Sequence, residues 1–409
     1  MFVGIDDTDS LEGMCTTFIA SRLLQLMKAK VEVKGFPRLI RLNPNIPFKT
    51  RGNGAVSFEI ENFDEKIKKV IVDFVLKNSQ REENTNPGIV FLDGISKELK
   101  RFSKEALHQV ISIRKAKILA ERLGADIHGE GNMRGIIGAL AAIGMPLNDY
   151  TYELLSYRLE KNFGKRRYVD EKSVKEMDRR FFPKIWDNYD YENKHICISP
   201  NGKDPVLYGV RGENPQMLLS AQRMLSTEEV DHLRIFLTNQ GTDQHLLRKK
   251  ISEIEEYNSV ITKGVVSQKP QNLKGGHVIF KIKDEKEIFC AAFEPTKNFK
   301  KIVRLLEVGD LVEAFGGVKE TKPGLTLNLE KLKVLNLVKK YKVLKPRCLK
   351  CGRMMKSVGR EKGYRCRRCG TKASKEASEK IFFERELRKG FYEVPPVARR
   401  HLAKPLLRF

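Results

Sequence analysis

The sequence lacks several signals that would assign it to a familiar enzyme class or to a membrane. It contains no Walker A motif, so any nucleotide must be held by something other than a P-loop. It also contains no HExxH motif and no nucleophile elbow. Its longest apolar stretch, residues 135–147, is too short to span a bilayer and instead predicts a tightly packed buried helix. The N-terminus has neither a charged leader nor a long apolar core, so we expect no signal peptide and no membrane partner.

Positive charge greatly exceeds negative charge in this chain. Its 409 residues include 77 Lys and Arg against 52 Asp and Glu, which gives a formal net charge of +25. A pI of about 9.7 usually indicates a polyanionic partner, most often nucleic acid. Residues 343–409 alone hold 20 Lys and Arg against 6 Asp and Glu. With 41% hydrophobic residues, a chain of this length is expected to fold into two to four domains.

Three aspartates follow a short apolar run at the start of the chain. Residues 2–5 are predicted to form a buried strand, and Asp6, Asp7 and Asp9 come directly after it. Carboxylates crowded in this way repel one another, and a cation among them removes the repulsion. Mg²⁺ is the usual cation, since it takes one or two carboxylates together with substrate phosphates. The cluster therefore predicts a magnesium and phosphate site in an enzyme, with a solvated turn as the alternative.

A helix is predicted directly after this cluster, over residues 14–27. Thr16 and Thr17 fall in its first turn, where free backbone N–H groups and the helix dipole favour a phosphate. A hydroxyl beside a metal-bound triphosphate can also accept a phosphoryl group. The alternative is that these threonines only cap the helix.

The segment 35–54 combines basic residues with turn residues. Its Gly52-Asn53-Gly54 turn can present backbone N–H groups to an anion before a strand over residues 55–60. Side chains that can reach phosphate oxygens are Arg38, Arg41, Lys49 and Arg51. An exposed basic turn without a ligand is the alternative.

Four cysteines near the C-terminus form two C-x₂-C pairs. They are Cys348 with Cys351, and Cys366 with Cys369. This spacing is close to the ribbon pattern in which four thiolates surround a tetrahedral Zn²⁺, which here would be structural. A disulfide pair or a redox motif is the alternative.

The remaining cysteines are expected to be buried free thiols. They lie in apolar segments, as Cys15, Cys197 and Cys290. Seven cysteines with four on zinc indicate a reducing compartment, and we therefore expect a cytoplasmic location.

The segment before the ribbon has the order of an OB-fold barrel. Strands are predicted over residues 260–266, 277–282, 288–293, 310–315 and 325–335, with a helix over 298–306 between the third and fourth. OB barrels commonly bind single-stranded nucleic acid. A small β domain without a ligand is the alternative.

The middle of the chain is predicted to be mixed α/β. Helices are expected over residues 103–123, 136–143, 151–159 and 215–225, and strands over 195–199, 206–211 and 233–237. The charged segment 162–189 interleaves basic residues with aromatics, which can hold an extruded base or simply anchor an irregular connection.

Long motifs along the whole chain resemble the 2-agmatinylcytidine synthetase family, which acts on a minor isoleucine tRNA. Residues 127–134 match no motif of that family. The motifs that match lie at residues 3–10, 13–17, 35–44, 49–58, 85–88, 138–142, 206–213, 275–278, 291–297, 390–396 and 398–401, together with the cysteine ribbon.

The resemblance implies four modules and a reaction. The modules are a kinase-like domain named for acting on threonine and cytidine (1–124), a ferredoxin-like domain (125–250), an OB fold (256–341) and a zinc ribbon with a basic tail (342–409). In the reaction, agmatine replaces the C2 oxygen of the cytidine at the first anticodon position, and ATP is converted to AMP and pyrophosphate. The partners would be this tRNA and agmatine, with no obligate protein partner.

The resemblance also implies roles for residues near the N-terminus. Asp6, Asp7 and Asp9 would position Mg²⁺ and the triphosphate, and Thr16 would take part in phosphoryl transfer. The residues expected to bind ATP or its phosphates are Thr8, Ser10, Thr17, Arg38, Arg41, Lys49, Arg51, Gly52 and Asn53. The target base must leave its stack to be reached, which costs roughly a few kcal/mol.

Agmatine is dicationic, so its pocket in this basic protein needs local carboxylates. The amine must also lose a proton before it attacks. On a predicted helix, Asp149 and Glu153 would sit one turn apart and are our candidates, with Asp187 and Asp190 as a second pair. For all four, a solvated helix face or turn is the alternative.

Two other functions are compatible with parts of the sequence. A metal-dependent phosphohydrolase or nuclease can be built on the same aspartate cluster, and a non-catalytic RNA-binding factor can be built from the OB fold and the ribbon. Neither accounts for every motif.

Overall fold

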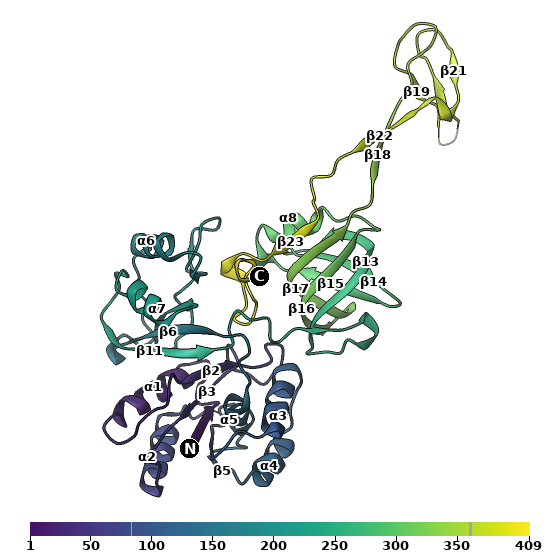
Figure 1. The fold of residues 1–409 in the computed structure, drawn as a ribbon. Helices are drawn as coiled ribbons and strands as arrows, with labels where there is room; N and C mark the ends of the chain where they lie inside the picture. Colours follow the sequence, from purple (N-terminus) through teal and green to yellow (C-terminus); the bar gives the residue numbers. More distant parts are fainter. Residues whose placement is uncertain (83, 360–361) are drawn as a thin grey trace.

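The computed structural model describes residues 1–82, 84–359 and 362–409, and it contains two large sheets of different kinds (Figure 1). One is an open sheet of nine strands in the order β5-β4-β1-β3-β2-β11-β6-β10-β7, and the other closes into a barrel. A small three-stranded unit stands apart from both at the end of a narrow stalk. The predicted fold class, a multidomain protein of α/β and α+β units with an OB-type barrel and a ribbon, is confirmed.

The first half of the open sheet lies between two layers of helices. Helices α1 (Thr16–Leu26) and α2 (Glu65–Asn78) pack on the face that carries Val3 and Ile5. The opposite face is covered by α3 (Lys97–His108), α4 (Ile113–Arg122) and α5 (Gly135–Gly144). The strands are β1 (Phe2–Asp6), β2 (Arg38–Arg41), β3 (Gly54–Glu59), β4 (Gly88–Leu92) and β5 (Asp126–Gly129).

One predicted helix is divided in the structure. The helix expected over residues 103–123 is two helices, α3 and α4, because the chain turns between them at residues 109–112. Ser112 accepts a hydrogen bond from the backbone N–H of Lys115, so it caps α4 and starts a new helix. The apolar periodicity continues through both helices, which explains why the break was not predicted.

Helix α5 packs closely against the sheet, and glycines in both the helix and the strands permit this contact. A Cβ atom on Gly138 would come within 1.8 Å of Oδ2 of Asp6, and one on Gly4 of β1 within 2.3 Å of the Ala139 carbonyl oxygen. Similarly, a Cβ on Gly88 of β4 would lie 2.1 Å from the backbone nitrogen of Ile136. The apolar stretch 135–147 is therefore a buried helix, as predicted, pressed against the strand that carries the aspartates.

The second half continues the same sheet. It is joined to the first half where β11 (Val230–Thr238) pairs in parallel with β2, so that Leu237 lies opposite Arg38. Helices α6 (Glu171–Phe181) and α7 (Pro215–Gln222) cover one of its faces. The other strands are β6 (Thr151–Arg158), β7 (Ile185–Trp186) and β10 (Val206–Gly212), and a small hairpin is formed by β8 (Tyr189–Asp190) and β9 (His195–Ile196).

The proposed module boundary at residue 124 falls inside this continuous sheet. Strand β5 and helix α5 follow residue 124 but pair with β4 and pack on β1, both in the first half. The boundary stays a prediction. The structure shows that strands on both sides of it belong to one hydrogen-bonded sheet.

The helix predicted over residues 151–159 is wrong, because this segment is strand β6. Its side chains alternate between two apolar clusters: Leu154 packs with α6 and α7, whereas Leu155 and Tyr157 pack with α1. A strand covered on both faces is a nearly continuous apolar run, which periodicity alone does not distinguish from a buried helix.

The barrel has the predicted strand order. β13 pairs with β14, β14 with β15, β15 in parallel with β17, β17 with β16, and β16 with β13, which closes the ring. Short strands β12 (Leu247–Arg248) and β23 (Gly390–Glu393) add to its edges. The barrel elements are β13 (Ser259–Asn272), β14 (Val278–Lys283), β15 (Glu287–Ala292), α8 (Phe299–Arg304), β16 (Leu311–Thr321) and β17 (Gly324–Asn336).

A stalk of two antiparallel strands carries the ribbon away from the barrel (Figure 1). The stalk consists of β18 (Lys340–Leu344) and β22 (Glu379–Phe383). The ribbon between them contains β19 (Lys356–Ser357), β20 (Tyr364–Arg365) and β21 (Lys372–Ala373). The ribbon is thus an insertion between barrel strands β17 and β23.

The last residues of the chain return from the barrel to the open sheet, and we call residues 394–409 the C-terminal strap. Buried Lys331 of β17 donates to the Lys404 carbonyl in the strap and to Asp243 in the linker that precedes the barrel. The neighbouring Glu330 accepts from His245, also in that linker. Burial would raise the pKa of Glu330, but the charges of His245 and of strap and barrel cations lower it to about 2. The strap and the linker therefore hold the barrel in place beside the open sheet.

Among the described residues, no helix is both long enough and apolar enough to cross a membrane.

The contact between α5 and β1 predicts the effect of one added methyl group. Gly138→Ala would force its Cβ onto the Asp6 carboxylate, and overpacking of this kind costs about 1–3 kcal/mol. We expect a lower Tm in thermal unfolding, together with loss of whatever activity Asp6 supports. Gly94→Ala is the matched control, because a Cβ there would meet nothing within 4 Å. An equal Tm for both variants would contradict the inferred packing constraint.

Candidate active site

A cavity of about 490 Å³ lies where the two halves of the open sheet meet the C-terminal strap. Asp6, Asp7 and Asp9 line it from the end of β1, and Thr16 and Thr17 line it from the start of α1. Other lining side chains come from β2 and the loop after it, from β6 and β10, and from the strap. No single module contains the whole cavity, so it forms only in the folded chain.

The three aspartates occupy a partly buried position in which their negative charge is costly. Burial raises the pKa of Asp6 well above its usual range, and the charge of Asp7 adds to this effect. Burial also raises the pKa of Asp7, to about 6, although its carboxylate accepts a hydrogen bond from the Asn86 N–H at 3.2 Å. Two carboxylates that resist ionisation at the end of one strand form a site whose charge a cation would stabilise.

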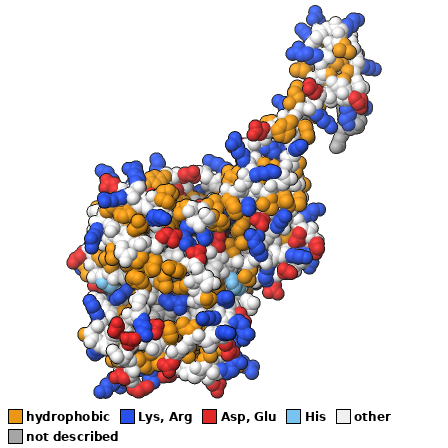
Figure 2. Space-filling view, viewed as in Figure 1, with side chains coloured by type: hydrophobic (Ala, Val, Ile, Leu, Met, Phe, Trp, Pro, Cys, Tyr) orange, Lys and Arg blue, Asp and Glu red, His pale blue; other side chains and the backbone are white. Residues whose placement is uncertain are grey.

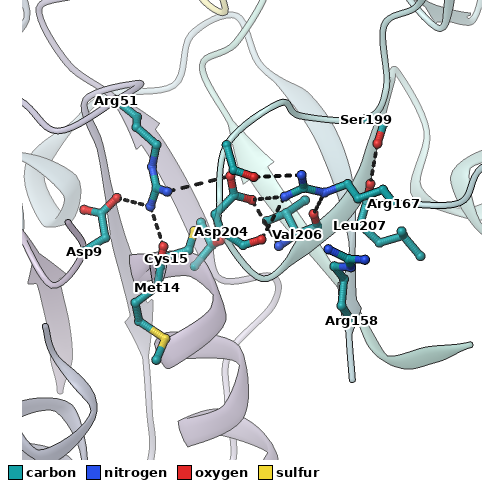
Figure 3. Close-up of polar contacts among 12 residues, drawn as sticks. Asp9, Met14, Cys15, Arg51, Arg158, Arg167, Ser199, Asp204, Val206 and Leu207 are labelled. Atoms are coloured by element: carbon teal, nitrogen blue, oxygen red, sulfur yellow. Dashed lines mark hydrogen bonds and ion pairs between the residues drawn. The ribbon is translucent and has the colours of Figure 1, made fainter. Parts of the chain in front are cut away.

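Asp9 differs from its neighbours because it already has a cationic partner. Its Oδ2 accepts from Arg51 at 2.5 Å (Figure 3). Burial raises its pKa, and the charge and hydrogen bond of Arg51 oppose that rise. Arg51 also reaches toward Asp204, which in turn binds Arg167, so acidic and basic groups alternate from the first half of the sheet into the second (Figure 3).

The first turn of α1 lines the cavity and has no side-chain cap. Its N-cap residue, Cys15, makes no capping hydrogen bond to the backbone. Buried Thr8 donates to the Thr16 hydroxyl at 3.0 Å, which holds that hydroxyl in place beside the aspartates. The Thr17 hydroxyl lies 2.9 Å from the Cys15 sulfur. A helix N-terminus with free N–H groups and hydroxyls is suited to an anion.

The predicted basic residues separate into three groups in the structure. Arg41 lines the cavity, and its buried Nε has no hydrogen-bond partner among the described residues. Arg51 is paired as described above, and Lys49 lines the cavity while donating to the Arg51 carbonyl. Arg38 does not line the cavity, because its guanidinium donates to the carbonyls of Ile143 and Met145 at the end of α5. Arg38 thus makes a helix-capping contact in the structure, and its phosphate contact stays a prediction.

The turn at residues 52–53 is shaped around the Arg41 side chain. Asn53 has a left-handed backbone, with φ of 45°, and its side chain donates to the Asn43 carbonyl. A Cβ on Gly52 would lie 2.6 Å from Nη1 of Arg41. Gly52 and Asn53 both line the cavity. Thr8 and Ser10 do not line it; the Ser10 hydroxyl donates to Glu82.

A linked set of buried polar groups on the opposite wall was not predicted. Arg211 of β10 donates from Nε to Glu153 of β6 at 2.9 Å, and its Nη2 lies 2.8 Å from Nδ1 of His401 in the strap. The charge of Arg41, followed by burial and the charge of Arg211, lowers the pKa of His401 well below its usual range. His401 is therefore neutral and accepts from Arg211. Both residues lie in motifs that support the family resemblance, but no spacing rule connects residue 401 with residue 211.

The predicted pairs of carboxylates for agmatine are divided by the fold. Glu153 lines the cavity, where Arg211 and Gln240 donate to it. Asp149 does not line the cavity and is paired with Lys404 and Arg408 of the strap. The helix that was expected to place these two residues one turn apart does not exist, since β6 occupies this segment.

The second predicted pair is divided in the same way. Asp187 lines the cavity and binds Arg399 of the strap at 2.7 Å. Asp190 does not line it, and its carboxylate accepts from the Asn193 side chain and backbone.

The four ribbon cysteines converge as zinc ligands do. Their sulfur atoms all lie within 4.8 Å of one another, and among the described residues this is the only group of three or more such ligand atoms. Gly352 and Gly370 follow the two knuckles with φ of 69° and 74°, a conformation that glycine adopts without strain. The aspartate oxygens are not gathered to this degree, so a cation at β1 would need further ligands such as phosphate oxygens.

Comparison with family models assigns most of the chain. Residues 2–63 match a model described as the TiaS TCKD domain, and residues 133–245 match the TiaS FLD domain. Residues 260–335 match an OB-fold nucleic acid binding domain, and residues 345–387 match the TiaS C-terminal zinc ribbon domain.

Relatives and solved structures match over the full length. The isoleucine-tRNA 2-agmatinylcytidine synthetase TiaS of Pyrococcus horikoshii is 48% identical over 414 residues, covering 100% of this chain and 97% of the relative. The crystal structure of TiaS in complex with its isoleucine tRNA and ATP superposes with a TM-score of 0.92 at 43% identity. That of TiaS in complex with the same tRNA, AMPCPP and agmatine gives 0.89 at 40% identity. In both comparisons, the aligned region covers 100% of this chain and 97% of the chain in the crystal structure.

The cysteine geometry predicts the result of removing one ligand. Cys366→Ser should lower the zinc content from about one ion per chain and unfold the ribbon, because structural zinc supplies folding free energy directly. Metal analysis and limited proteolysis of the ribbon would measure this. Cys290→Ser is the control, since Cys290 lies in the barrel core and should leave the zinc content unchanged. Full zinc retention in Cys366→Ser would contradict the four-thiolate site.

Proposed function

The chain belongs to the TiaS family of isoleucine-tRNA 2-agmatinylcytidine synthetases, and we propose that its cavity activates the wobble cytidine of this tRNA with ATP and joins agmatine to it. The protein is an ATP-dependent ligase whose substrates are the minor isoleucine tRNA, ATP and agmatine. The observation that carries the proposal is that Asp6, Asp7, Thr16 and Arg41 all line one cavity, and that the buried Nε of Arg41 has no hydrogen-bond partner in the described part of the chain. The modules 1–124, 125–250, 256–341 and 342–409, and a cytoplasmic location, remain proposals.

The triphosphate of ATP is proposed to lie between the first turn of α1 and Arg41. Free N–H groups of α1 and the Thr17 hydroxyl supply hydrogen bonds, and Arg41 supplies a guanidinium whose buried Nε has no partner within the described part of the chain. Lys49 and the Gly52-Asn53 turn complete this wall of the cavity. A buried N–H group without an acceptor is costly, so a phosphate that accepts from Nε of Arg41 removes a penalty as well as adding a contact.

Asp6, Asp7 and Asp9 are proposed to hold Mg²⁺ together with phosphate oxygens. The raised pKa values of Asp6 and Asp7 fit this role, because a divalent cation favours the charged form of the carboxylates, which burial disfavours. When bound, the ion neutralises the charge that develops on the phosphoryl group. Asp9 additionally forms an ion pair with Arg51 near the first turn of α1.

The C2 oxygen of cytosine is a poor leaving group until it is esterified. In the proposed sequence this oxygen bonds to an ATP phosphorus and the rest of the ATP departs. The deprotonated amine of agmatine then attacks C2, and the oxygen leaves with its phosphate. Thr16 is proposed to take part in the phosphoryl transfer, because its hydroxyl is oriented by Thr8 next to the aspartates. Of the first predicted pair for agmatine, only Glu153 remains in this proposal.

Replacement of one aspartate tests the function without removing the side chain. Asp7→Asn keeps an acceptor for the Asn86 N–H but loses the charge, so we expect agmatine addition to fall by about 100-fold or more. The assay combines protein, ATP, Mg²⁺, agmatine and the tRNA transcript, followed by mass spectrometry of the anticodon nucleoside. Binding of the tRNA should be unchanged.

Asp93→Asn is the matched control for that experiment, because Asp93 is exposed at the opposite end of β4. Wild-type release of nucleotide without any agmatine-bearing nucleoside would instead indicate a phosphohydrolase. Full product formation by Asp7→Asn would contradict the role given to the aspartates.

His401 is proposed as a positioning residue for Arg211. His401→Ala removes the acceptor of a charged donor, an interaction of about 1.5–3 kcal/mol, so we expect kcat/KM to fall by roughly 10- to 100-fold. His401→Gln keeps an acceptor and should recover part of that loss, whereas a merely structural role would be seen as an equal drop in Tm for both. Steady-state kinetics and thermal unfolding together distinguish these cases. Equal activity in wild type and His401→Ala would contradict the role.

A further inference from the structure

The stalk between the barrel and the ribbon exposes an unusual number of large apolar side chains. Their exposed fractions run from 37% for Leu344 to 57% for Phe382. Figure 2 shows apolar side chains on the narrow connection to the ribbon, with charged side chains of both signs beside them. The set comprises Tyr341, Val343, Leu344, Ile381, Phe382 and Phe383. A two-stranded hairpin of this kind has little independent stability, so its apolar surface is expected to have a partner.

Both faces of the stalk carry apolar groups. Tyr341 lies directly opposite Phe382 in the strand pair, and their rings meet edge to face with centroids 6.2 Å apart. Because directly opposed residues share a face, this aromatic pair defines one side of the stalk. Phe383 pairs with Lys340 and defines the other side. The stalk projects away from the barrel (Figure 1), and Lys340 at its base pairs with Glu307 of the barrel.

Lysines interleave with these apolar residues and are free to meet an external anion. Lys342 pairs across the stalk with Ile381, and Lys380 with Val343. Within the described part of the chain, Lys342, Lys345 and Lys380 have no acidic group at ion-pair distance, whereas Lys340 is paired with Glu307 of the barrel. In the C-terminal strap, by contrast, Arg399, Lys404 and Arg408 are all paired with carboxylates.

We propose that the stalk is a stacking platform for unpaired bases of the bound tRNA, with Tyr341 and Phe382 against base faces and the free lysines against the flanking phosphates. This inference rests on the proposed function, which supplies a tRNA substrate. Exposed aromatic rings among cations are the usual means of holding single-stranded nucleic acid. Paired regions do not fit, because an A-form helix keeps its bases stacked and presents only edges and backbone.

The lysines also argue against a protein partner on this surface. The centres of protein interfaces are depleted of lysine, and burying Lys342 or Lys380 against an apolar surface would leave a charge unpaired. An RNA backbone instead supplies a phosphate for each such lysine and releases counterions on binding.

The test compares two double variants, one that removes both aromatic rings and one that keeps an aromatic ring at each position. Tyr341→Ala with Phe382→Ala removes both rings, and Tyr341→Phe with Phe382→Tyr retains both. At one fixed salt concentration, we expect the Kd for the tRNA transcript to rise between about fivefold and about 150-fold in the first variant, the effect of losing one stacked base, and by less than about twofold in the second. The Kd for a fully paired RNA duplex of equal length should be the same in all three proteins.

Three further measurements make the outcome decisive. Zinc content and Tm should match in the three proteins, which shows that the ribbon and stalk remain folded. Equal tRNA affinity in wild type and the alanine variant would overturn the proposal, and so would an equal loss of duplex binding. A shift from dimer to monomer in sedimentation, with tRNA affinity unchanged, would assign the surface to self-association and also overturn it. Failure of the proposed function can be distinguished from failure of this proposal, because the wild-type protein would then form no agmatine-bearing nucleoside.

Discussion

The cost of burying negative charge at the end of β1 organises the part of this protein that surrounds the cavity. Asp6 lies under α5, close enough that only a glycine fits at position 138, and burial raises its pKa together with that of Asp7. Arg51 relieves this cost for Asp9 alone. The charge of Asp6 and Asp7 has no such partner among the described residues, which is why we propose this end of the strand for a cation and the phosphates of ATP.

The C-terminal strap explains why a chain with separate modules can have one cavity. After the ribbon, the chain returns through β23 on the barrel and delivers Arg399 and His401 to the wall opposite the aspartates. The same segment is fixed to the barrel through Lys331 and to the body through Asp149. The cavity is therefore complete only when the barrel, the strap and both halves of the open sheet are all in place.

The concentrated positive charge of the C-terminal region serves two different purposes. Cations of the strap pair with carboxylates of the open-sheet domain and hold the strap against it. Lys342 and Lys380 of the stalk are exposed to solvent, as are the aromatic rings of Tyr341 and Phe382. Net charge indicated a polyanionic partner correctly, but it did not distinguish these roles, because composition does not record which charges are paired within the fold.

The sequence alone determined the features whose signals are local. The strand and aspartates at residues 2–9, the OB strand order, the cysteine quartet and the family motifs are each contained in a short segment, and the zinc geometry and fold class agree with them. The tertiary structure decided what depends on distant residues. It made residues 151–158 a strand covered on both faces, gave Arg38 to the end of α5 and Asp149 to the strap, and brought His401 to Arg211. These outcomes arise from packing and charge pairing between separate segments, more than 100 residues apart for Arg38, Asp149 and His401, which periodicity and spacing within a segment do not encode.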